Sequence, residues 1–131
     1  MSKAAILCVD DEKVILDSLK TQLKEEFGNA YLYELADDAD DALELIDELT
    51  EEETKVILII CDWLMPGMKG DEFLIRVHQR FPAIIKILLT GQADQKAIKR
   101  AQEQANIYRC LSKPWSEGEL VETIKSGLAN I

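Results

Sequence analysis

The stretch V-I-L-I-I-C at residues 56–61, which ends at Asp62 and runs into W-L-M-P-G at residues 63–67, decides the fold. Its unbroken run of apolar residues, rich in β-branched side chains, predicts a strand that is buried on both faces. The proline and glycine that follow predict a loop. A strand buried on both faces needs helices above and below its sheet, which is the arrangement of α/β proteins.

The rest of the chain alternates in the same way between short apolar runs and segments with helical spacing of apolar residues. Five strands that are each followed by a helix predict a doubly wound α/β sandwich, with a parallel sheet and helices on both faces. The predicted strands span residues 4–9, 31–36, 56–61, 84–89 and 107–111, and the predicted helices span residues 12–27, 39–49, 73–81, 97–105 and 116–128.

Size and charge narrow the classes of function. The chain has 131 residues, of which 47% are hydrophobic, and we expect one domain that covers residues 1–131. Its formal net charge of −10 argues against direct binding to nucleic acid or to an anionic membrane. The apolar runs are too short for a signal peptide or a membrane-spanning helix.

The cysteines point to a reducing environment. Cys8, Cys61 and Cys110 are odd in number, lie far apart in the sequence and form no C-x-x-C pair. This pattern argues against a disulfide framework and against a zinc site. Each cysteine stands in an apolar run, where a free thiol packs as a small hydrophobic group. We therefore expect a cytoplasmic protein.

Polar residues stand at the ends of four predicted strands: Asp10 and Asp11 after the first, Asp62 after the third, Thr90 after the fourth and Lys113 after the fifth. In a parallel sheet these ends share one edge, and ligands bind there where the strand order reverses. In a five-stranded sheet of order 2-1-3-4-5, that point lies between the strands that carry the three aspartates.

Three carboxylates in one crevice repel each other, by roughly 4 kcal/mol for two charges about 4 Å apart at an effective dielectric constant near 20. Either one carboxylate is protonated or a cation lies among them, and Mg²⁺ prefers oxygen ligands of this kind. A lysine and a hydroxyl group nearby would hold a phosphoryl group, and one carboxylate could then act as a nucleophile and form an acyl phosphate.

These motifs together resemble the receiver domain of two-component response regulators. The resemblance rests on Asp10–Asp11, on D-W-L-M-P-G at residues 62–67, on Thr90–Gly91 and on Lys113–Pro114, in that order along the chain. It implies a flavodoxin-like sandwich of five parallel strands in the order 2-1-3-4-5. It also implies that Asp62 accepts a phosphoryl group from a sensor histidine kinase or a histidine phosphotransfer protein.

The resemblance further implies a set of site residues. Mg²⁺ would be bound by Asp11, by Asp62, by the backbone carbonyl of Leu64 and, through water, by Asp10. Lys113 would pair with the phosphoryl oxygens, and its peptide bond to Pro114 would be cis.

The resemblance assigns the conformational switch to Thr90, whose hydroxyl would turn towards the phosphoryl group. Family members usually carry an aromatic residue three positions before the lysine, where this chain has Cys110. Tyr108, two residues earlier and expected on the same side of the strand, is the candidate substitute.

As a response regulator receiver, the chain would catalyse only its own phosphorylation and dephosphorylation. The switch would be read by an output domain or effector protein at the face formed by the fourth helix, fifth strand and fifth helix, and the same face could form a homodimer.

Two other classes of protein could also carry acidic residues at this sheet edge. A phosphatase of the haloacid dehalogenase type would also use an aspartate nucleophile, but it carries D-x-D after its first strand, where this chain has D-D-E. A receiver-like module that is never phosphorylated would lack some of the acidic or lysine positions, and all of them are present. A further acidic group at residues 37–41 lacks the glycine of a calcium-binding loop and indicates a capped helix start.

Overall fold

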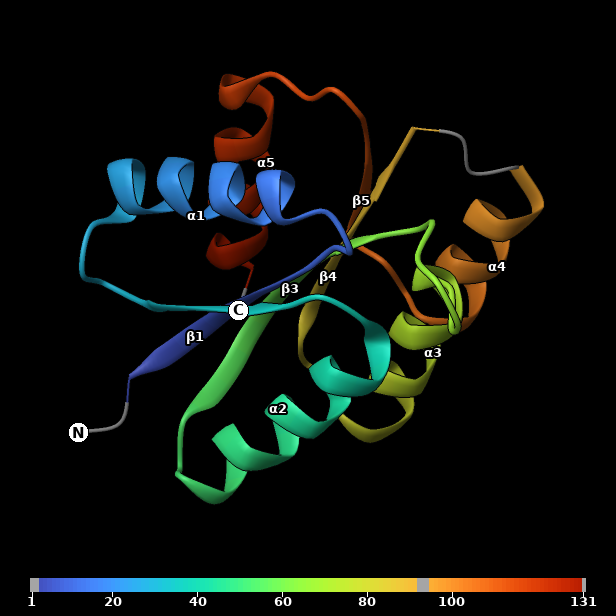
Figure 1. Cartoon of the computed structure of the whole chain (residues 1–131), viewed down its shortest axis with the longest axis horizontal. Coiled ribbons are helices and arrows are strands. Elements are labelled where there is room, and N and C mark those ends of the chain that lie inside the picture. The colour runs from blue at the N-terminus through green and yellow to red at the C-terminus, as the bar shows by residue number, and fades with distance from the viewer. Residues whose placement is uncertain (1–2, 92–94, 131) are drawn as a thin grey trace.

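Five parallel strands form one hydrogen-bonded sheet in the computed structural model, which describes residues 3–91 and 95–130 (Figure 1). The strand order is β2-β1-β3-β4-β5, which confirms the predicted fold class and order. Every pair of neighbouring strands is parallel. The strands are β1 (Ala4–Val9), β2 (Leu32–Ala36), β3 (Lys55–Asp62), β4 (Ile85–Thr90) and β5 (Arg109–Ser112).

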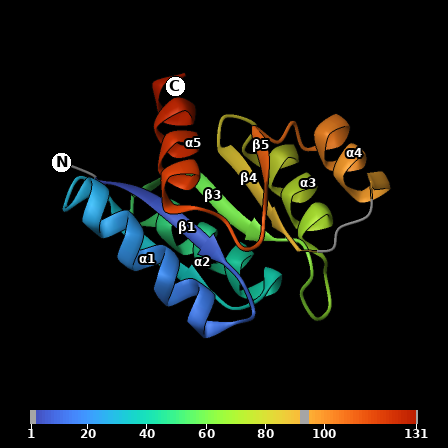
Figure 2. The ribbon, with the colours of Figure 1, turned by 90° about the horizontal axis from the view of Figure 1, so that it is seen from above.

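The five helices cover both faces of the sheet (Figures 1 and 2). One face packs against α1 and α5, and the other packs against α2, α3 and α4. None of the helices in the described residues is long and apolar enough to cross a membrane. The helices are α1 (Lys13–Phe27), α2 (Ala39–Glu51), α3 (Gly70–Arg80), α4 (Gln95–Gln104) and α5 (Glu117–Ala129).

The central strand β3 sends alternate side chains into two separate cores. Leu58 and Ile60 pack beneath α1 and α5, whereas Ile59 and Cys61 pack on the side of α2, α3 and α4. All four side chains are fully buried. Burial of each such aliphatic side chain contributes roughly 1.5–3 kcal/mol, and it fixes the register that brings the end of β3 to the edge of the sheet.

Side-chain caps start α2 and α5, whereas α1 and α3 begin without one. At the start of α5, Ser116 accepts a hydrogen bond from the backbone N–H of Glu119, at 3.1 Å. Asp38 caps α2 by accepting from the N–H of Asp41 at 2.7 Å, which agrees with the interpretation of this acidic group as a helix start. Helix α3 begins three residues before the first apolar residue of its predicted range, Phe73, because polar residues fill its first turn.

One buried charge was not predicted from the sequence. Lys86 lies in β4, is 1% exposed, and its Nζ donates a hydrogen bond to the carbonyl of Ile84 at 2.7 Å. Burial lowers the pKa of Lys86 to about 8. The alternation of β4 sends this side chain into the core, so the fold carries the desolvation cost of an ammonium group.

Lys86→Met should change how stability depends on pH. Between the lowered folded-state pKa of about 8 and the usual value of 10.5, the unfolded chain holds a proton on Lys86 that the folded chain has lost. The wild type should therefore gain about 2 kcal/mol relative to the Met variant between about pH 7 and about pH 9.5. Urea denaturation at both pH values measures this, and a difference that stays constant with pH would contradict the assignment.

Candidate functional site

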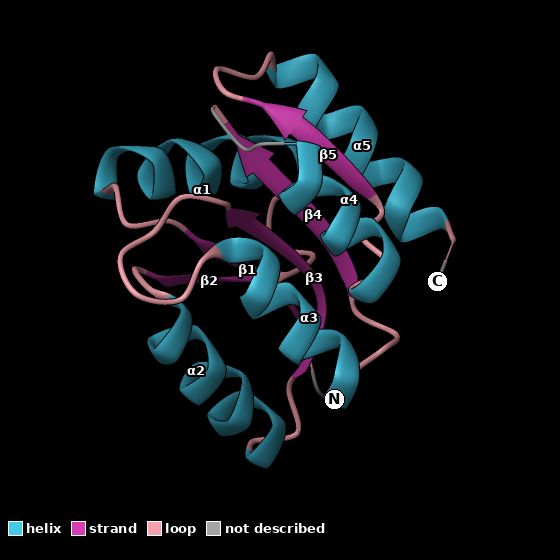
Figure 3. Ribbon diagram, turned by 90° about the vertical axis from the view of Figure 1, so that its right-hand side faces the viewer, coloured by secondary structure: helices cyan, strands magenta, loops and turns pink. Residues whose placement is uncertain are grey.

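The carboxyl ends of the parallel strands lie at one edge of the sheet (Figure 3), and the predicted site residues stand at these ends. Asp10 directly follows β1, and Asp62 ends the neighbouring strand β3. Asp62 is paired with Leu89, the residue before Thr90, and Thr90 is paired with Ser112, the residue before Lys113. Four segments that are distant in sequence therefore meet at the carboxyl ends of adjacent strands.

Three carboxylates converge at this edge. Asp10, Asp11 and Asp62 each offer an oxygen atom, and these atoms all lie within 4.8 Å of one another. Asp10 is fully buried, Asp62 is 4% exposed and Asp11 is exposed, so the group is open to solvent on one side. A donor set of three carboxylate oxygens with an open side fits Mg²⁺, which keeps water or phosphate oxygens among its ligands.

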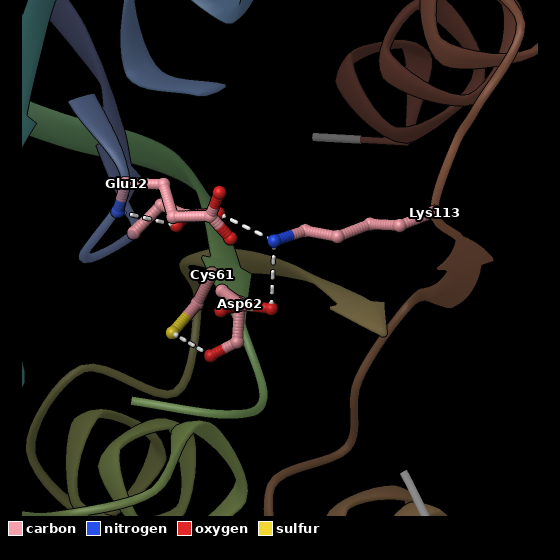
Figure 4. A network of polar contacts seen from close by, with 5 residues as sticks. Glu12, Cys61, Asp62 and Lys113 are labelled. Atoms are coloured by element: carbon pink, nitrogen blue, oxygen red, sulfur yellow. Dashed lines mark hydrogen bonds and ion pairs between the residues drawn. The ribbon is translucent and has the colours of Figure 1, made fainter. Parts of the chain in front are cut away.

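Lys113 reaches across the edge to the two buried carboxylates (Figure 4). Its Nζ lies 2.8 Å from Oδ2 of Asp10 and 3.0 Å from Oδ1 of Asp62. Burial alone lowers the pKa of Lys113, but its hydrogen bonds and charge attraction to Asp10 and Asp62 outweigh this, and the pKa is raised. Lys113 is therefore held as a cation between the carboxylates.

The negative charge of the site exceeds what Lys113 compensates. Burial raises the pKa of Asp62, Lys113 lowers it in part, and the charges of Asp10 and Asp11 raise it again, so that the net shift is upward. Asp10 is oriented by the backbone N–H of Glu12, which donates to its Oδ1 at 2.9 Å. A divalent cation among the three carboxylates would favour the ionised form of Asp62.

The two segments that flank the site are tied to the sheet by backbone hydrogen bonds. The N–H of Lys113 donates to the carbonyl of Thr90 at 3.0 Å, and the N–H of Trp63 donates to the carbonyl of Leu89 at 2.9 Å. The peptide bond between Lys113 and Pro114 is cis, as the family resemblance implies. Leu64 follows in the loop with its side chain half-exposed, and the role of its carbonyl stays a prediction.

Gly70 is a site-positioning residue that the sequence reasoning missed. A Cβ atom on Gly70 would lie 2.2 Å from the carbonyl oxygen of Asp62 and 2.9 Å from Cα of Trp63. The N–H of Gly70 also donates to the carbonyl of Trp63 at 2.8 Å, which closes the loop between β3 and α3. The start of α3 therefore lies directly against the backbone of Asp62, and no side chain fits between them.

The two candidates for the switch beside Thr90 do not share a side of the sheet. Cys110 packs with the core beneath α2, α3 and α4. The ring of Tyr108 instead contacts Gly127 of α5, and its hydroxyl forms a hydrogen bond with Ser126. The expectation of a shared side was wrong because β5 begins only at Arg109, so that strand alternation does not extend back to Tyr108. Thr90 itself is buried at the end of β4.

The fold and the charged residues at the sheet edge define the class of protein. It is a doubly wound α/β domain with acidic groups and a lysine where the strand order reverses. The response regulator receiver domain family matches the sequence over residues 6–125. The chain belongs to this family.

Individual proteins with similar sequences support this membership. The chain is 34% identical to the hydrogenase transcriptional regulatory protein HoxA of Cupriavidus necator over 126 residues. This aligned region covers 96% of this chain and 24% of that protein. The chain thus spans about a quarter of the length of the curated relatives it matches.

Solved structures agree as well. The signal receiver domain of an HD domain-containing protein from Pseudomonas fluorescens Pf-5 is 37% identical, with a TM-score of 0.87 and coverage of 98% of this chain and 96% of that one. A CheY-like receiver domain protein from Methanospirillum hungatei JF-1 is 32% identical, with a TM-score of 0.85 and the same coverage.

Gly70→Ala should destabilise the protein, because the new methyl group meets the Asp62 backbone, which cannot move aside freely. We expect a loss of about 2 kcal/mol or more in the free energy of unfolding. Gly118→Ala is the matched control, since a Cβ there meets nothing within 4 Å, and in the first turn of α5 it should be neutral or stabilising. Equal effects of both substitutions in urea denaturation would contradict the role of Gly70.

Proposed function

We propose that residues 1–131 form one receiver domain, which accepts a phosphoryl group on Asp62 from a sensor histidine kinase or a histidine phosphotransfer protein. The observation that carries this proposal is the convergence of three carboxylates and Lys113 at one sheet edge. Asp62 is contacted by Lys113 and ends the central strand β3. A phosphoryl group could approach it from the open side of the site.

Phosphoryl transfer to Asp62 needs a nucleophile, charge neutralisation and a fixed geometry. An ionised Asp62 oxygen attacks the phosphorus, the bond between phosphorus and the donor nitrogen breaks, and the imidazole of the donor leaves. Mg²⁺ bound by Asp11, by Asp62, by the carbonyl of Leu64 and, through water, by Asp10 would neutralise the charge that develops on the phosphoryl oxygens. These four residues form the proposed metal site.

Lys113 supplies the second positive charge. In the structure its ammonium group lies between Asp10 and Asp62, within reach of oxygens attached to Asp62. A lysine acts here as a point charge that follows the phosphoryl group once it is attached. Thr90, at the end of the adjacent strand, would donate its hydroxyl to a phosphoryl oxygen. Asp62, Thr90 and Lys113 are thus the groups that would contact the reacting atoms.

Phosphorylation would be read as a shift between two conformations. The proposed switch consists of Thr90, the loop after it, Cys110 and Tyr108; residues 92–94 of that loop lie outside the described part of the chain. The readout would be the face formed by α4, β5 and α5, which would contact an output domain, an effector protein or a second copy of the chain. The relation to a transcriptional regulatory protein supports an output of this kind.

The cellular setting proposed for this signalling is the cytoplasm. Cys8 and Cys61 are free and fully buried, and burial raises the pKa of both thiols, so that they stay protonated. Buried protonated thiols are compatible with a reducing compartment and do not act as nucleophiles. We propose no enzymatic activity beyond phosphorylation and dephosphorylation of the domain itself.

Asp62→Asn should abolish phosphorylation by acetyl phosphate in the presence of Mg²⁺, because an amide cannot act as the nucleophile. Intact-mass spectrometry measures the phosphorylated fraction directly. Glu51→Gln is the control: it removes one exposed carboxylate at the C-terminal end of α2 and should leave incorporation unchanged. Phosphate incorporation that persists in Asp62→Asn would contradict the assignment of the phosphoacceptor.

Mg²⁺ should change the fluorescence of Trp63 saturably, since its backbone directly follows Asp62. The second tryptophan is removed as Trp115→Phe, and Asp11→Asn should then weaken Mg²⁺ binding by about tenfold or more. Because the pKa of Asp62 is raised, protons should compete with Mg²⁺ at higher pH than for an ordinary aspartate. Glu51→Gln serves again as the control, and equal loss of Mg²⁺ affinity in both variants would contradict the predicted metal site.

A further inference from the structure

A polar hollow lies between α4 and the loop of residues 63–69, which joins β3 to α3. Its volume is about 470 Å³, and none of the four charged residues of the sheet-edge site lines it. Helices α3 and α4, which border it, lie side by side over the same face of the sheet (Figure 3). We call it the α3–α4 hollow, and the side chains that matter in it are those of Trp63, Lys69, Asp71, Glu72, Lys96 and Arg100.

The α3–α4 hollow is positively charged in an otherwise acidic protein. Its two carboxylates already have cationic partners: Arg76 lies 3.2 Å from Glu72, and Arg100 lies 3.6 Å from Asp71. Lys69 and Lys96 form no ion pair with any carboxylate in the described residues. Two uncompensated ammonium groups therefore face the hollow, whereas the whole chain carries a net charge of −10.

Trp63 adds a buried donor that lacks an acceptor. Its side chain lines the hollow and is 9% exposed, and its Nε1–H has no hydrogen-bond partner in the part of the chain that the structure describes. Lys69 lies over its ring, 4.8 Å from the ring centroid. A buried indole N–H usually finds an acceptor, because leaving it without one costs free energy. The hollow thus has positive charge in excess, and the indole N–H of a tryptophan in its wall lacks an acceptor among the described residues.

We propose that the α3–α4 hollow binds a small phosphate-bearing anion, independently of phosphorylation at Asp62. A phosphate group offers several acceptor oxygens and more than one negative charge, which matches two lysines, the remaining donors of Arg100 and the indole N–H. The volume of the hollow lies in the range of small-molecule sites, so that an organic phosphate such as a nucleotide fits better than phosphate alone.

The indole N–H signal of Trp63 provides a direct test. In ¹⁵N-labelled Trp115→Phe protein, the chain has a single indole resonance, which is followed during titration with sodium pyrophosphate or with ADP, in EDTA and at constant ionic strength set with chloride. A saturable shift with either anion supports the proposal. Tighter binding of ADP identifies a nucleotide-type ligand, and equal binding identifies the phosphate group alone as the recognised chemistry. A shift that chloride reproduces would overturn the proposal.

Charge variants on α4 locate the binding. Lys96→Gln should weaken the affinity for the anion by about tenfold, because it removes an uncompensated charge from the hollow. Lys99→Gln is the matched control on the same helix: Lys99 does not line the hollow and lies 4.0 Å from Glu103. Equal effects of the two variants would overturn the proposal. Asp62→Asn should leave anion binding unchanged, so a loss there would place the anion at the sheet edge and refute a separate site.

Discussion

The contact of one ammonium group with two buried carboxylates is the constraint on which this structure depends. Asp10 and Asp62 are almost completely buried on adjacent strands, and two negative charges in such a position are stable only with positive charge between them. Lys113 supplies part of that charge from the far side of the sheet edge. Burial raises the pKa of Asp62, Lys113 offsets this in part, and the charges of Asp10 and Asp11 raise it again. A cation among the three carboxylates would relieve their mutual repulsion.

The two cores explain how the chain can hold such charges. Strands β1 and β3 are buried on both faces over most of their length, so apolar packing fixes their register. The site carboxylates stand only where these strands end. Apolar burial therefore sets their position, and their electrostatic cost falls at one edge, whereas Lys86 carries a separate desolvation cost within β4.

Local patterns carried the prediction of strands, strand ends and caps, because period and capping are properties of neighbouring residues. The sheet order came from the family resemblance. Contacts between separate segments of the fold could not be predicted from local patterns. Gly70 has a steric role only because α3 begins against the backbone carbonyl of Asp62. The burial of Lys86 could not be predicted either, because a lysine in an apolar run can face the core or the solvent. Tyr108 was placed on the wrong side because the true start of β5 was not visible in the sequence.

The hydrogen bond between Tyr108 and Ser126 has a mechanical consequence. It fastens the residue just before β5 to the last turns of α5, and the Tyr108 ring packs against Gly127 beside it. The hydroxyl is held at α5, so an inward turn of the Tyr108 ring would have to break its hydrogen bond to Ser126. A displacement at the start of β5 that kept this bond intact would draw the end of α5 with it.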